Sequence, residues 1–161
     1  MMERKILITL LLSLFSIVTF AQSPHSLSVS VGGSQTINKE AYSFILSTSH
    51  SYQMNSLWTV ITTYVNDIEK DFSGGEVEQI NYTGSLSFGF SRKFYEGSKS
   101  EVYLGMTKDI VENQKILLGD SFFDVGYSFI LSRKICPKLG YSHNLNKGTD
   151  SINFGLSITI F

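Results

Sequence analysis

The stretch that most constrains the fold of this chain is the last one, Ser151–Phe161, in which apolar and polar residues alternate. Side chains along a β-strand point alternately to opposite faces. One face of this segment is therefore apolar and carries Ile152, Phe154, Leu156, Ile158 and Ile160. The other face holds Ser, Asn, Gly and Thr. The pattern predicts a strand with hydrocarbon or core on one side and water on the other.

Seven earlier segments alternate in the same way. They are His25–Gly33, Glu40–Tyr52, Ser56–Asp67, Ile80–Ser91, Glu101–Asp109, Ser121–Ser132 and Lys138–Leu145. Residues 56–67 also fit helical spacing, but their β-branched content favours a strand. We expect loops at 67–78 and 110–120. We also expect a turn at Arg133–Pro137, because Pro cannot sit in a central ladder. Eight antiparallel strands predict a sandwich or a barrel.

The N-terminal segment Met1–Ala21 has the features of a secretory signal peptide. Arg4 and Lys5 precede a 15-residue apolar stretch, and Ala21 is a small residue suited to a cleavage site. We expect cleavage to leave one domain of residues 22–161. The formal net charge of −1 gives no indication of nucleic-acid binding. The single cysteine, Cys136, excludes an intramolecular disulfide.

With these features, an exported chain of eight alternating strands that ends on Phe resembles the small eight-stranded outer-membrane β-barrel proteins of Gram-negative bacteria. The resemblance implies an all-β, antiparallel, up-and-down transmembrane barrel in the cell outer membrane, in contact with its lipid. It also implies that the barrel-insertion machinery reads the closing strand through Phe154, Leu156, Ile158, Ile160 and Phe161. Strict alternation places Phe161 on the face opposite Ile160.

The same resemblance orients the connections. With a periplasmic N-terminus, the turns near Gln53, Lys99 and Ile135 are periplasmic. The connections at 33–39, 67–78, 110–120 and 146–150 are then external. The longest stretches without strand alternation therefore fall outside the cell.

Four charged residues fall within predicted strands and are expected to point into the lumen, because a charge facing lipid at the bilayer midplane costs ~2–4 kcal/mol. They are Glu101, Asp109, Asp124 and Lys138. They predict either a polar pathway or small-ligand site, or a salt-bridge network that fills the barrel; we favour the network, because eight strands enclose little more than side chains. The acidic stretch 67–78 lacks the oxygen spacing of a Ca²⁺ loop, so we expect no metal site and no cofactor.

We expect a non-enzymatic protein with a structural, adhesive or binding role through its external loops. One alternative is a lipid-modifying outer-membrane enzyme. The segment around His143 is faintly similar to outer-membrane lipid A deacylases, but Leu145 stands where those enzymes have Ser, and Ser142 points to the other face. The second alternative is a soluble periplasmic barrel or sandwich that binds a small apolar ligand, with its aromatic faces turned inward.

Overall fold

The computed structural model of the chain describes residues 24–37, 41–73, 76–113, 115–116, 118–132 and 134–160. The predicted signal peptide and Phe161 lie outside these residues. The strands are β1 (His25–Thr36), β2 (Ala41–Gln53), β3 (Trp58–Ser73), β4 (Glu76–Lys93), β5 (Ser100–Glu112), β6 (Lys115–Ile116), β7 (Ser121–Phe129), β8 (Ile135–Asn144) and β9 (Asp150–Thr159).

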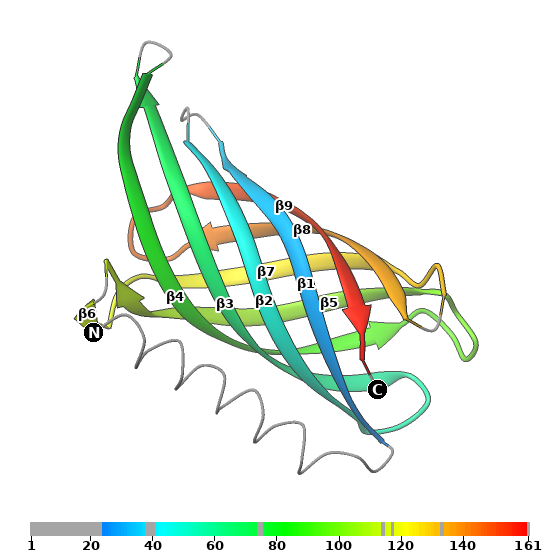
Figure 1. Cartoon of the computed structure of the whole chain (residues 1–161). Helices are drawn as coiled ribbons and strands as arrows, with labels where there is room; N and C mark the ends of the chain where they lie inside the picture. The colour runs from blue at the N-terminus through cyan, green and yellow to red at the C-terminus, as the bar shows by residue number, and fades with distance from the viewer. Residues whose placement is uncertain are drawn as a thin grey trace.

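Eight of these strands close into an antiparallel barrel (Figure 1). The order around the barrel is β1-β2-β3-β4-β5-β7-β8-β9, and β9 returns to pair with β1. The two-residue β6 pairs only with the end of β5. The described residues include no helix long and apolar enough to cross a membrane. The predicted all-β, eight-stranded barrel is confirmed, and residues 58–73 are a strand.

The barrel has two ends, which we call distal and proximal. The distal end holds the β1–β2, β3–β4, β5–β7 and β8–β9 connections. The proximal end holds the start of β1, the end of β9 and the three remaining connections. This matches the predicted alternation of the connections.

Three local predictions were wrong. Most of the stretch predicted as a loop at 67–78 is strand: β3 runs to Ser73, and β4 starts at Glu76. Likewise β5 continues to Glu112, past a register shift in its pairing with β4 between Gly84 and Ser85. Pro137 lies inside β8, opposite Leu156 of β9. The pairing of β8 with β7 ends at Lys138 and Ser128, one residue short of Pro137. Pro137 has no backbone N–H, but it therefore removes no ladder hydrogen bond to β7.

The outer surface of the barrel is apolar. On β4 the outward side chains Leu86, Phe88 and Phe90 are exposed, and their inward neighbours Ser85 and Ser87 are buried. The same arrangement holds on β9, where Phe154, Leu156 and Ile158 are exposed, and Ile160 just after the strand is exposed as well. A closed barrel with an apolar exterior satisfies all its backbone groups internally, as a transmembrane β-barrel must. The alternative of a soluble barrel with inward aromatic faces is therefore wrong.

Candidate functional site

Two cavities lie inside the described part of the barrel, and serine and threonine are the commonest residues in their linings. The distal chamber has a volume of about 510 Å³ and reaches from Glu112, Asp120 and Lys147 at the distal rim down to Glu101 and Lys138. The proximal chamber has a volume of about 290 Å³ and reaches from Pro24 and Lys134 to the same two residues. Small polar side chains leave this space because the inward positions of the strands carry little volume.

All four charged residues singled out in the sequence line the distal chamber: Glu101, Asp109, Asp124 and Lys138. Among the residues described, however, they form no ion pairs with one another; the ion pairs there are Asp120–Lys147 and His143–Asp150. The favoured salt-bridge network is therefore wrong.

Hydroxyl groups hold the inward carboxylates instead. Asp124 accepts hydrogen bonds from Thr107 Oγ1 at 2.5 Å and from Ser142 Oγ at 2.6 Å. Asp109 accepts one from Ser85 Oγ at 2.6 Å. Asp124 is bonded to both neighbouring strands and Asp109 to one, so short polar contacts crosslink the lumen wall.

Glu101 lies where the two chambers meet. Its carboxylate accepts hydrogen bonds from Ser91 Oγ at 3.1 Å on one neighbouring strand and from Ser128 Oγ at 2.9 Å on the other. Lys138 lines both chambers with Glu101, and its side chain is solvent-accessible within the lumen. One acid held in place and one accessible ammonium group thus lie together where the two chambers meet.

Tyr103 is the bulkiest polar side chain near this meeting point. Gly89 and Gly105 face each other across β4 and β5, and the Tyr103 ring occupies the space above them. A Cβ on Gly89 would come within 2.6 Å of Tyr103 Cε2. The Tyr103 hydroxyl forms a hydrogen bond of 2.8 Å with Ser87 Oγ. The ring is therefore held flat against the wall, which keeps the distal chamber open.

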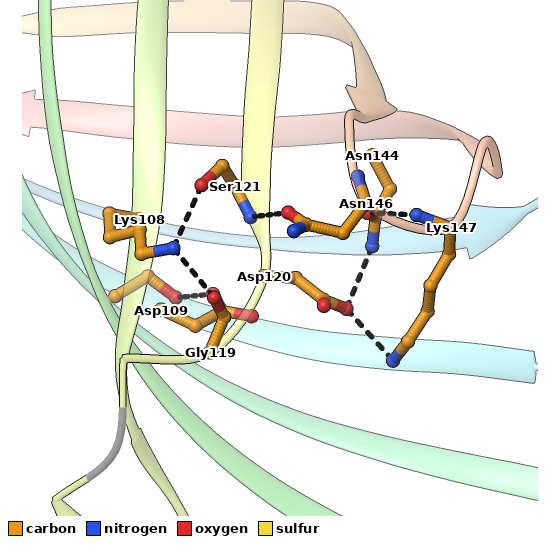
Figure 2. Close-up of polar contacts among 9 residues, drawn as sticks. Lys108, Asp109, Gly119, Asp120, Ser121, Asn144, Asn146 and Lys147 are labelled. Atoms are coloured by element: carbon orange, nitrogen blue, oxygen red, sulfur yellow. Dashed lines mark hydrogen bonds and ion pairs between the residues drawn. The ribbon is translucent and has the colours of Figure 1, made fainter.

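At the distal rim, an ion pair joins two connections (Figure 2). Lys147 Nζ in the β8–β9 turn lies 2.8 Å from Asp120 Oδ2, which precedes β7. Asn144 Nδ2 donates to the same carboxylate at 2.9 Å. Desolvation opposes ionisation of Asp120, but the hydrogen bonds from Lys147 and Asn144 outweigh it and lower the Asp120 pKa. The hydrogen bond to Asp120 raises the Lys147 pKa.

Further contacts fasten the same rim (Figure 2). Lys108 Nζ donates to the Gly119 carbonyl at 2.7 Å and to Ser121 Oγ at 2.9 Å. The Ser121 backbone N–H donates to Asn146 Oδ1 at 2.7 Å. We call Lys108, Asp120, Ser121, Asn144, Asn146 and Lys147 the rim latch. Sequence analysis missed it, because its partners come from three strands whose relative height depends on register.

His143 contacts a carboxylate at the distal end of β8. Its Nδ1 lies 2.7 Å from Asp150 Oδ1, and the Tyr141 hydroxyl donates to the same oxygen at 2.5 Å. The adjacent Ser142 points the other way and donates to Asp124. The described residues also contain no group of three or more His, Cys, Asp or Glu side chains placed to hold a metal ion.

The remaining distal feature is a ribbon formed by β3 and β4, which projects beyond the other strand ends (Figure 1). β4 has 18 residues, whereas ~9–11 tilted residues cross a bilayer. β5 pairs with β4 only from Thr83 onward. In the described part of the chain, Glu76–Ile80 therefore has β3 as its only strand partner.

Comparison with known proteins shows which solved structures share this fold. No protein-family model matches the chain, and no curated protein sequence does. Among solved structures, a de novo designed transmembrane β-barrel matches with a TM-score of 0.58 and 12% identity, over 86% of this chain and 98% of the designed one. The structure of Ail, the attachment invasion locus protein of Yersinia pestis, determined in a phospholipid bilayer nanodisc, matches with a TM-score of 0.56 and 13% identity. The match covers 84% of this chain and 99% of the Ail chain. The chain thus has the fold of small transmembrane barrels.

Proposed function

We propose that this protein is a non-catalytic outer-membrane barrel that binds an extracellular protein partner through the β3–β4 ribbon. The outer-membrane placement is supported by the apolar exterior and by the shared fold, because bilayers of that membrane are where closed barrels of this kind insert. The binding role is supported above all by one observation: the ribbon continues its ladder well past the length that a membrane requires.

The ribbon offers two kinds of contact. Its free β4 edge at Glu76–Ile80 presents backbone donors and acceptors to which an extended segment of another chain can pair. Its outward face carries Ile68, Ile80 and Tyr82 as exposed side chains. The Tyr82 hydroxyl donates to Asn66 Oδ1 at 2.7 Å, which orients the ring on that face. Backbone pairing provides affinity, and these side chains provide specificity.

The rest of the distal end supports the choice of the ribbon. The β5–β7 and β8–β9 connections are fastened to each other by the rim latch. Loops held in this way are poor candidates for adapting to a partner, whereas a ribbon with an open edge needs no rearrangement to accept a strand. One structure of the same fold belongs to a protein named for attachment, so the fold is compatible with such a role.

The absence of catalysis belongs to the same proposal. A Ser–His pair needs a hydroxyl within hydrogen-bond reach of the imidazole. In the described residues His143 contacts a carboxylate that Tyr141 also contacts, and Ser142 lies on the opposite face of β8.

The test uses the full-length protein in lipid nanodiscs and a phage-displayed library of random 12-residue peptides. The ribbon variant replaces residues 69–81 by Asn-Gly, which closes Ile68 and Tyr82 into a two-residue hairpin. The matched control is Ile116→Ser with Leu118→Ser, which changes two exposed residues of another distal connection.

We expect the unmodified protein and the control to enrich the same peptides. The ribbon variant should enrich these peptides at least tenfold less. Equal enrichment by the ribbon variant would contradict the proposal. Heat-dependent gel mobility of all three proteins checks that each barrel is closed.

A further inference from the structure

The two chambers together extend from one end of the barrel to the other. The distal chamber includes Thr36 and Lys147 at the rim, and the proximal chamber includes Gln53 and Lys134 at the opposite end. They share four lining residues: Ser49, Ile61, Glu101 and Lys138. These four residues therefore lie where the two chambers meet.

The distal chamber is acidic. Asp67, Glu69, Asp109 and Asp124 all line it within the strands. Asp67 Oδ1 and Ser30 Oγ are buried atoms of its lining that no described protein group hydrogen-bonds. Buried polar atoms of this kind require water as a partner. A hydrated cavity with carboxylates in its wall attracts small cations.

Lys138 is the cation that lines both chambers. Within the described residues its ammonium group forms no ion pair, although Glu101 also lies where the two chambers meet. The carboxylate of Glu101 is bonded to Ser91 and Ser128 instead. An accessible positive charge where the acidic distal chamber meets the proximal chamber raises the energy of a cation that passes it.

We propose that the lumen is a pathway for small inorganic cations such as K⁺, and that the Lys138 side chain is the barrier within it. The distal carboxylates select cations over anions. The ammonium group where the two chambers meet keeps the current small in the unmodified protein. The inference rests on the closed barrel and is independent of the ribbon's binding role.

The first test measures single-channel current of the full-length protein in planar lipid bilayers under a tenfold KCl gradient. Lys138→Gln retains most of the side-chain length and removes the charge. We expect at least a threefold larger conductance than in the unmodified protein and a reversal potential that indicates K⁺ over Cl⁻. Lys115→Gln, on the exposed β6 outside both chambers, is the matched control and should leave the current unchanged.

A second measurement does not depend on conductance. Cys136 lines the proximal chamber next to Lys138 and is the single cysteine of the chain. A cationic methanethiosulfonate reagent converts an accessible thiol into a mixed disulfide and releases methanesulfinate. Added at the distal side of oriented vesicles, it should label Cys136 at least threefold faster in Lys138→Gln than in the unmodified protein.

The outcomes separate cleanly. Absence of current in both proteins, with heat-dependent gel mobility showing closed barrels, would overturn the pathway. Anion preference in Lys138→Gln would overturn the selectivity, and equal distal labelling of Cys136 in both proteins would overturn the role of Lys138 as the barrier. Lys138→Met is the second variant if Lys138→Gln does not fold.

Discussion

The ring of Tyr103 lies so close to Gly105, two residues farther along β5, that a Cβ on Gly105 would overlap the phenol oxygen. The same ring lies over Gly89 on β4. Gly126 on β7 pairs with Tyr103, but a Cβ there would find its nearest neighbours only at 3.6 Å. Gly89 and Gly105 thus leave the space that the Tyr103 ring occupies, whereas Gly126 has room for a Cβ.

Gly105→Ala should therefore destabilise the barrel, because the Tyr103 ring must move and its bond to Ser87 must break. We expect a loss of ~1–3 kcal/mol in the free energy of unfolding, the usual cost of overpacking. Urea unfolding in lipid vesicles, followed by the fluorescence of the single tryptophan, Trp58, measures it. Gly126→Ala is the matched control, and a loss of equal size there would contradict this account of Tyr103.

The rim latch should respond to pH. The Asp120 pKa is lowered in the folded protein, so the ionised carboxylate stabilises the fold. This stabilisation is fully present above the ordinary Asp pKa of about 4 and is lost as the pH falls through the lowered value. The Lys147 pKa is raised, so its contribution is lost only as the pH rises above about 10. Amide hydrogen exchange at residues 118–121, corrected for intrinsic rate, should be slow at pH 7 and become faster as the pH falls through the lowered Asp120 pKa.

In Lys147→Ala, amide hydrogen exchange at residues 118–121, corrected for intrinsic rate, should already be fast at pH 7. The rate should then depend little on pH. The exposed Lys134→Ala, at the proximal end, is its control. An unchanged exchange rate in Lys147→Ala would mean that the ion pair does not fasten the β5–β7 connection.

The outward and inward faces should differ sharply in their tolerance of charge. Leu104 faces outward on β5 and is 51% exposed, so Leu104→Arg would place a charge in hydrocarbon at a cost of ~2–4 kcal/mol near the midplane. Ser30→Lys places an amine in the distal chamber and should cost far less. Urea titration of both variants in vesicles compares them, and equal losses would contradict the assignment of the faces.

The seam between β1 and β9 should depend on Gly32. Gly32 pairs with Gly155, and a Cβ on Gly32 would overlap the backbone carbonyl oxygen of Phe154. Gly32→Ala should therefore reduce the fraction of protein with heat-dependent gel mobility. Gly140→Ala, whose Cβ would meet ordinary contacts of 3.4 Å or more, is the matched control. An unaltered closed fraction in Gly32→Ala would show that the seam tolerates displacement.

The barrel was predictable because its pattern is local. Alternation along each strand, as in Phe88 between Ser87 and Gly89, requires no knowledge of the neighbouring strand. The same logic failed for residues 67–78, because Asp67, Glu69 and Lys70 are charged and yet form part of a ladder. Asp67 and Glu69 line the distal chamber, so a charge on the inward face of a strand does not mark the end of that strand.

The interior was only half predictable. Polarity alone indicated that Asp124 and Glu101 point inward. Their partners, Thr107, Ser128 and others, depend on the stagger between strands, which no single segment encodes. Opposite charge suggested pairs with Lys138, but hydroxyls on directly neighbouring strands lie closer.

The measurement that tests the account most directly is the gel mobility of the protein from membrane fractions, with and without boiling. A closed barrel embedded in the outer membrane predicts recovery in that fraction and a band that shifts on boiling. Recovery as a soluble periplasmic protein whose band does not shift would contradict the membrane barrel, and with it the ribbon and the cation pathway.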